Sequence, residues 1–286
     1  MIYARLIGID NYAFGAGLHG CKTDVANMAA FLGGHNVRVL NPSLQDSSAY
    51  REAIVETLQG DVDRLGDGDE LIVHFSGHGA TVDVGGGNAE AVVCPYDFRE
   101  GVRTTGIGAA DVDALVANML PTARMTIFAD CCFSGGLQPD YVATLRRTIS
   151  GAMQLVGSWL RISPRRVRVR SFARSPVFTV TAAQLPLAAT GTKGNVVVLA
   201  ANRGKSGEYD FGQGYEGVFT HFLLQHLSDA GTAEPASSTC DAVNNLTLDF
   251  AQQAELHGRS ASYGDPLIQA ANAPPPPAAA PSTALT

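Results

Sequence analysis

The chain has 286 residues, of which 45% are apolar, so it can bury a sizeable core. Its 27 acidic residues exceed its 20 basic ones and give a net charge of −7, a balance that argues against a nucleic-acid partner. No apolar run approaches the roughly 20 residues that span a bilayer, so we expect no membrane association.

Cysteine usage favours a reducing compartment. The five cysteines are odd in number, irregular in spacing and include an adjacent pair, which makes a poor disulfide framework. They are Cys21, Cys94, Cys131, Cys132 and Cys240. The N-terminus lacks the basic and long apolar regions of a signal peptide. We therefore expect a cytoplasmic protein.

Taken in chain order, strands alternate with helices. Short apolar runs predict strands at 3–9, 36–40, 70–75, 89–94, 124–129 and 194–200. Apolar residues at helical spacing predict helices at 24–32, 47–65, 109–120, 218–227 and 246–256. This alternation is typical of an α/β fold with a mostly parallel sheet, in which ligands bind beyond the carboxyl ends of the strands.

Composition divides the chain into four parts. Residues 1–140 carry most of the predicted elements, and residues 191–270 carry the late ones. Between them, 141–190 is an insertion rich in arginine, without acidic residues among its six arginines from Arg161 to Arg174. The tail 271–286, rich in proline and alanine, cannot build a core, and we expect it to be disordered.

Two predicted strands end in residues that suit nucleophilic catalysis. The strand 70–75 leads to His78, and the strand 124–129 leads to Cys132, 54 residues later. A cysteine nucleophile needs a base within reach and donors for the oxyanion. We expect Cys132 to attack, His78 to move the proton, and the N–H groups of Gly79 and Cys132 to bind the oxyanion.

Strand periodicity selects Cys132 over its neighbour Cys131. Side chains alternate between the two faces of a strand, so Asp130 and Cys132 share one face and Cys131 takes the other. By the same rule Ser76 lies on the face of His78. We therefore expect Cys131 to pack in the core.

These motifs resemble the signature blocks of metacaspases and bacterial orthocaspases. The sequences HFSGHG at 74–79 and DCCFSG at 130–135 carry the resemblance, and IGIDNY at 7–12 adds to it. The commoner family pattern has His where Phe133 stands. The resemblance implies a caspase-like sandwich with a central, mostly parallel sheet of about six strands flanked by helices. It also implies a large-subunit-like part at 1–140 and a small-subunit-like part at 191–270. The family needs no third triad side chain, and we nominate none.

The resemblance also implies an acidic S1 pocket that binds a basic P1 side chain. The family positions that build it fall on Cys21, Asp24, Ser76 and Asp130, and all four residue types agree. Two carboxylates in a cleft favour a guanidinium, so we expect protein or peptide substrates with Arg over Lys at P1. Taken alone, Asp24 is equally well explained as a helix N-cap.

Many metacaspases are activated by calcium through clustered carboxylates. An acidic pair should stand near 107–110, but these positions hold no acidic residue. Glu90 and Asp140 are the remaining candidates, and a calcium site needs six or more oxygens. We therefore expect no required cofactor.

The resemblance and the residues together predict a monomeric cysteine endopeptidase that cleaves after basic residues. The alternatives are a catalytically silent caspase-like interaction module and a cysteine enzyme with another acyl substrate. The arginine-rich insertion has three interpretations: a solvated loop, a contact for an acidic partner, and a site of self-cleavage after Arg161, Arg166, Arg170 or Arg174.

Overall fold

A computed structural model of the chain describes residues 1–85, 88–131, 167–169, 195–201, 207–250, 252–258 and 263–269. Cys132, most of the insertion and the tail 271–286 lie outside these residues. No helix within the described ranges has the length and apolar character needed to cross a bilayer.

A central sheet organises the described residues. Its strands run in the order β12-β9-β7-β4-β1-β2, and β3 also pairs with β1. The strands are β1 (Ile2–Gly8), β2 (Arg38–Val39), β3 (Leu44–Gln45), β4 (Glu70–Ser76), β7 (Arg124–Asp130), β9 (Asn195–Ala200) and β12 (Glu255–Gly258). All their pairings are parallel except that of β12 with β9. The predicted mostly parallel sheet is confirmed, and late strands complete the sheet that early strands begin.

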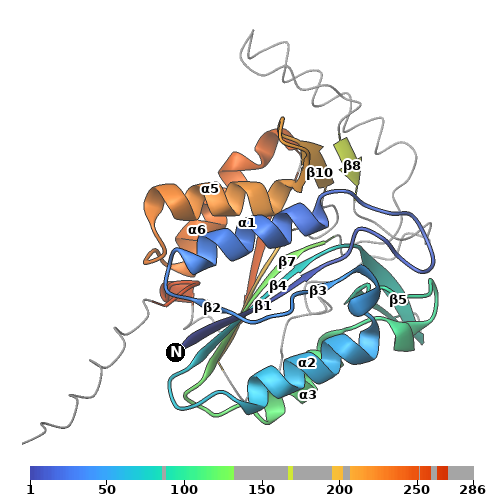
Figure 1. Cartoon of the computed structure of the whole chain (residues 1–286), viewed down its shortest axis with the longest axis horizontal. Coiled ribbons are helices and arrows are strands. Elements are labelled where there is room, and N and C mark those ends of the chain that lie inside the picture. The colour runs from blue at the N-terminus through green and yellow to red at the C-terminus, as the bar shows by residue number, and fades with distance from the viewer. Residues whose placement is uncertain are drawn as a thin grey trace, which may run out of the picture.

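Helices cover both faces of the sheet (Figure 1). One layer contains α1 (Cys21–Gly33), α5 (Val218–Ala230) and α6 (Ala236–Leu246), and the other contains α2 (Arg51–Asp63) and α3 (Ala109–Ala117). Three-residue 3-10 helices lie at Asp46–Ser48, Arg103–Thr105 and Leu248–Phe250.

Each strand supplies side chains to two separate cores because its residues alternate between faces. On β7, Met125 and Ile127 join the core under α2 and α3, whereas Phe128 joins the core under α1, α5 and α6. Burial on both faces explains why β4 and β7 have apolar residues at consecutive positions, as in Leu71-Ile72-Val73 and Ile127-Phe128-Ala129.

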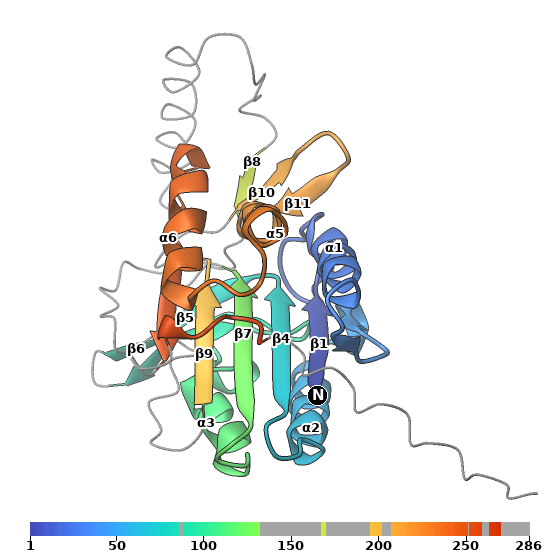
Figure 2. The same cartoon turned by 90° about the vertical axis from the view of Figure 1, so that its left-hand side faces the viewer.

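Two smaller sheets lie at the ends of these strands. The strands β5 (Gly79–Gly85) and β6 (Asn88–Val93) form an antiparallel pair that continues from β4. The strands β10 (Gly207–Asp210) and β11 (Tyr215–Gly217) form a hairpin, and β8 (Val167–Val169) pairs with β10. Figure 2 shows this second group beyond the arrowheads of β4 and β7, where sequence reasoning places the reactive residues.

The predicted helix at 246–256 is wrong. The helix α6 ends at Leu246, and the chain then turns into a 3-10 helix and the strand β12. The Thr247 side chain fixes this turn, because its hydroxyl lies 2.9 Å from the carbonyl oxygens of both Val243 and Gln252 and shares its one proton between them. The helix α6 was missed because its apolar signal is weak: its buried positions are the small side chains Ala236, Thr239, Cys240 and Val243.

Candidate active site

The site lies where β4 and β7 end side by side. Ser76 and Asp130 are the last residues of these strands and are direct register partners. Both side chains are fully buried, and Gly77 N–H donates to the Asp130 carbonyl at 3.2 Å. The chain then continues to His78 from β4 and to Cys131 from β7, so the two sequence motifs start from adjacent points.

His78 is held in one tautomer by a main-chain group. Its Nε2 lies 2.8 Å from the carbonyl oxygen of Ala16, in the loop between β1 and α1. A carbonyl oxygen can only accept, so Nε2 carries the proton and Nδ1 is the basic nitrogen of the neutral ring. The Ala16 carbonyl thus orients the His78 ring, a task for which sequence reasoning nominated no side chain.

Tyr12 supports His78 from the other side. The His78 N–H donates to the Tyr12 hydroxyl at 2.7 Å, and the two rings lie 4.8 Å apart. Burial raises the pKa of the Tyr12 phenol well above its ordinary value, so the hydroxyl stays neutral. Gly77 permits this approach, because a Cβ there would lie 2.6 Å from the Tyr12 hydroxyl oxygen.

The N–H of Gly79 points away from β6. Cys94 N–H donates to the His78 carbonyl at 3.0 Å, so His78 and Cys94 occupy a hydrogen-bonded position of the antiparallel pair. The next pair, Gly79 and Val93, must then direct its N–H and C=O groups outward. Val93 does so, since it exchanges both main-chain bonds with Ile107. The Gly79 N–H therefore lies on the edge of β5 that faces away from β6, where it is available to a group outside the β5–β6 pair.

Cys131 lies on the face that strand alternation predicts. Its side chain is fully buried and belongs to the core beneath α2 and α3. Asp130 lies on the opposite face, towards α5. Cys131 is thus a packing residue in this structure.

The candidate S1 residues meet at the first turn of α5. Asp24 Oδ1 accepts from Gly217 N at 2.7 Å, and Asp24 Oδ2 accepts from the Ser76 hydroxyl at 2.6 Å. Asp130 Oδ2 accepts from the main-chain N and the hydroxyl of Thr220, at 3.1 and 2.8 Å. The N-terminus of α5 stabilises both negative charges, because its N–H groups and dipole point at them.

Asp24, Ser76 and Asp130 are therefore brought together, although none of the three is exposed. A carboxylate can accept about four hydrogen bonds. Asp24 and Asp130 can therefore keep their bonds to Gly217, Ser76 and Thr220 and still accept bonds from a cationic side chain. Cys21, the fourth candidate, is fully buried at the start of α1, and its N–H donates to Asp10 Oδ1 at 2.8 Å. Because it is buried and has a short side chain, Cys21 could form part of the wall of an S1 pocket but could not bond a distant substrate group.

Sequence reasoning missed Ala16, Gly217 and Thr220. Ala16 and Gly217 act through main-chain groups, which leave no signal in side-chain type. Thr220 could have been found as the hydroxyl residue in the first turn of a predicted helix, but its partner Asp130 lies 90 residues away.

The calcium candidate Glu90 is engaged by other donors. Its carboxylate accepts from Arg103 at 2.8 Å and from Ala109 N at 3.1 Å. The neighbouring Asp111 pairs with Arg51, and these groups line a cavity of about 270 Å³. The described residues contain no cluster of three His, Cys, Asp or Glu that could hold a metal ion. Asp140 lies outside the described residues.

We predict that activity does not need calcium. Two guanidinium groups already neutralise the carboxylates of this cavity, and a hard cation would have to displace them. Excess EDTA should change peptide hydrolysis by less than about twofold, and added calcium should not restore or raise it. Loss of activity in the chelator that calcium reverses would contradict this prediction.

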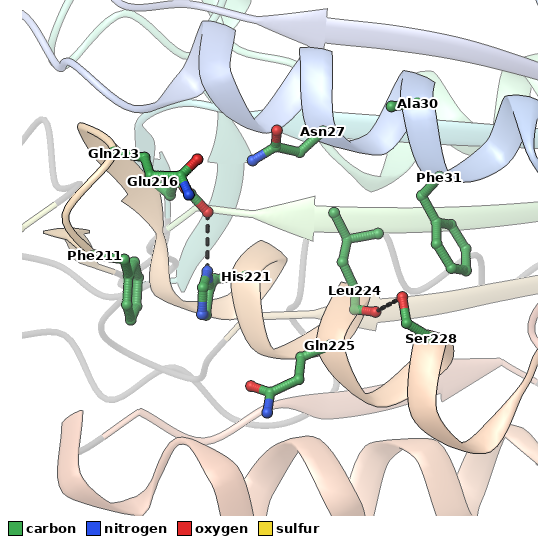
Figure 3. Close-up of a pocket in the computed structure, with 10 residues that line it drawn as sticks. All are labelled: Asn27, Ala30, Phe31, Phe211, Gln213, Glu216, His221, Leu224, Gln225 and Ser228. Carbon is green, nitrogen blue, oxygen red and sulfur yellow. Dashed lines mark hydrogen bonds and ion pairs between the residues drawn. The ribbon is translucent and has the colours of Figure 1, made fainter.

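A separate groove of about 670 Å³ lies between α1, α5 and the β10–β11 hairpin (Figure 3). Glu216 Oε2 bonds His221 Nδ1 at 2.9 Å at its edge, and the His221 ring stacks on Phe211 at 3.7 Å. Neither His78 nor the S1 candidates line this groove.

Comparisons with known proteins find similarity mainly in the first half of the chain. Residues 3–139 match the family model described as the metacaspase peptidase C14 domain. The chain is 30% identical over 160 residues to metacaspase-1 of Scheffersomyces stipitis, covering 51% of this chain and 39% of the relative. It is 31% identical over 186 residues to metacaspase-1A of Neurospora crassa, covering 55% and 39%. It therefore spans about two fifths of the length of these curated relatives.

The fold extends over more of the chain than the sequence match. The crystal structure of protein GSU0716 from Geobacter sulfurreducens aligns with a TM-score of 0.61 at 15% identity, covering 93% of this chain and 97% of that one. A likeness at this identity speaks for the fold alone. The family match, by contrast, includes the segments that carry His78, Asp24 and Asp130. Over residues 3–139 the chain is thus similar in sequence to metacaspases of the peptidase C14 family.

Proposed function

We propose that this protein is a cysteine endopeptidase that cleaves after Arg in preference to Lys, with His78 and Cys132 as its catalytic pair. The observation that carries the proposal is the setting of His78. The residue is 2% exposed, its Nε2–H donates to the Ala16 carbonyl, and it follows Ser76 by two residues. Cys132 follows Asp130, the register partner of Ser76, also by two residues.

The proposed reaction is acyl transfer through a thioester. His78 Nδ1 takes the proton of the Cys132 thiol, and the thiolate attacks the carbonyl carbon of the P1 residue. The N–H groups of Gly79 and Cys132 bind the resulting oxyanion. Collapse of this intermediate expels the amine, which takes a proton from the protonated His78. Water then gives a proton to His78 and attacks the thioester, which releases the acid and regenerates the Cys132 thiolate.

The P1 preference rests on the two carboxylates at the first turn of α5. Asp24 and Asp130 are linked through adjacent strands and the Ser76 hydroxyl, so their charges act on one small volume. A planar guanidinium can satisfy two carboxylates with directed bonds, whereas an ammonium acts as a point charge. An aspartate at P1 would be repelled.

A panel of fluorogenic peptides that differ only at P1 tests the proposal. We expect hydrolysis of the Arg peptide, slower hydrolysis of the Lys peptide and none of the Asp peptide. Efficient turnover of the Asp peptide by the wild type would contradict the proposed pocket.

We also predict self-cleavage within 141–187. This stretch concentrates arginine between Cys132 and β9, and only 167–169 of it lies within the described residues. The bonds after Arg161, Arg166, Arg170 and Arg174 match the proposed S1 pocket. Mass spectrometry of aged wild-type protein should show two fragments split in this stretch.

The Cys132→Ala variant is the control, because it presents the same bonds to any contaminating protease. It should stay whole. A wild-type chain that stays whole while it hydrolyses Arg peptides would show that the enzyme is active without self-cleavage and would contradict this prediction.

A further inference from the structure

The loop that carries Ala16 is held against β1 by Asp10. The Leu18 N–H donates to the Asp10 carbonyl at 2.7 Å, and the Cys21 N–H donates to the Asp10 carboxylate at 2.8 Å. These two bonds fix the point at which the loop returns to α1. They do not involve the N–H groups of His19 and Gly20, which form the outer side of the loop and face the β10–β11 hairpin.

Glu208 of β10 holds that outer side. Its Oε2 accepts from the N–H groups of His19 and Gly20 at 2.9 and 2.8 Å, although the residues are 188 to 189 positions apart in sequence. The Glu208 side chain is fully buried. Gly20 lets the hairpin approach closely, because a Cβ there would lie 3.0 Å from the main chain of Glu216.

Glu208 and His78 are therefore connected through one short loop. The carboxylate binds the main chain at positions 19 and 20, and the Ala16 carbonyl, three residues earlier, accepts from His78 Nε2. A buried carboxylate with two N–H donors is a strong anchor, since bonds to a charged acceptor are roughly twice as strong as neutral ones. Without this anchor the loop would keep its bonds from Leu18 and Cys21 to Asp10 and from Ala13 N–H to the Tyr96 carbonyl, but its outer side would be released and the Ala16 carbonyl could shift relative to the ring.

We infer that Glu208 is a positioning residue for His78: it docks the β10–β11 hairpin onto the loop and thereby holds the Ala16 carbonyl on Nε2. This inference rests on the proposed function, because it assigns Glu208 a part in the same reaction. It makes the orientation of the catalytic base depend on a hairpin from the late part of the chain.

Three variants test the inference. Glu208→Ala removes the anchor, and Glu208→Gln keeps an amide oxygen that can accept both N–H bonds. Glu216→Ala is the matched control, because it removes a carboxylate from the same hairpin that bonds His221 instead of the loop (Figure 3). Thermal denaturation of all three identifies losses that come from unfolding.

We expect kcat for an Arg peptide to fall roughly 10- to 100-fold in Glu208→Ala, with KM changed less than about twofold, because a misplaced catalytic group slows chemistry more than binding. Glu208→Gln should recover most of kcat, and Glu216→Ala should keep it. An equal loss of kcat in Glu208→Ala and Glu216→Ala would overturn the inference, since it would reflect general damage to the hairpin.

A second measurement does not depend on turnover. Nitrogen-15 NMR of the histidine rings reports which nitrogen carries the proton, and the His78→Ala spectrum identifies the His78 signals among those of the seven histidines. In a Cys132→Ala background, His78 should be an Nε2–H tautomer that becomes mixed when Glu208 is alanine. An unchanged tautomer would overturn the inference. If the wild type hydrolyses no peptide, the proposed function fails, and this comparison alone decides the role of Glu208.

Discussion

Cys132→Ala and His78→Ala should each lower peptide hydrolysis by about 10⁴-fold or more, because a nucleophile and its base act as a unit and the loss of either stops the reaction. The double variant should be no slower than either single variant, for the same reason. Initial rates on an Arg peptide, normalised to folded protein by circular dichroism, measure the effect.

Cys131→Ala is the matched control for this result. Its thiol is fully buried in the core under α2 and α3, so alanine there should cost about 1 kcal/mol of stability and leave most of the activity. The reverse outcome, an inactive Cys131→Ala and an active Cys132→Ala, would move the nucleophile to Cys131 and contradict the strand-face assignment.

Asp24→Asn should lower kcat/KM for an Arg peptide by roughly 100-fold, because it removes one charge from a buried pair. The change is nearly isosteric. The asparagine oxygen can still accept from Gly217 N, and its NH₂ group can donate to the Ser76 hydroxyl, so α1, β4 and α5 remain tied together. The loss therefore measures charge and not structure.

A peptide with citrulline at P1 provides the internal comparison, since citrulline has nearly the shape of arginine without its charge. The Asn variant should hydrolyse it at least as well as the wild type. An equal loss on the arginine and citrulline peptides would place the defect in catalysis or folding and would remove Asp24 from the S1 pocket.

Much of the framework was predictable because strong local patterns specify it. β1, β4, β7 and β9 are buried on both faces and contain consecutive apolar residues, and the structure confirms the predicted strands to within one residue at each end. The order of the strands in the sheet was not predictable, because parallel strands pair with partners that are far apart in the sequence. The short strands β10, β11 and β12 contain Glu, Asp, Gly and His, so no apolar run in the sequence predicts them.

The candidate site was predictable where side chains carry the chemistry. His78, Asp24, Ser76 and Asp130 stand in motifs, and strand alternation put three of them on one face. The main-chain groups that bond His78 and Asp24 were not predictable. A carbonyl such as that of Ala16, or an N–H such as that of Gly217, occurs in almost every residue and leaves no mark in the sequence. Glu208 looks like an ordinary polar residue until the fold places its carboxylate on His19 and Gly20.

Affinity labelling tests whether Cys132 is a nucleophile that lies beside a pocket for arginine. Wild-type protein is treated with an arginyl chloromethyl ketone and with its aspartyl counterpart, and the modified cysteine is located by peptide mass mapping. We predict stoichiometric labelling of Cys132 by the arginyl reagent, none by the aspartyl reagent, and loss of labelling in His78→Ala. Labelling at another cysteine, or an unlabelled Cys132 in the folded wild type, would contradict this role of Cys132.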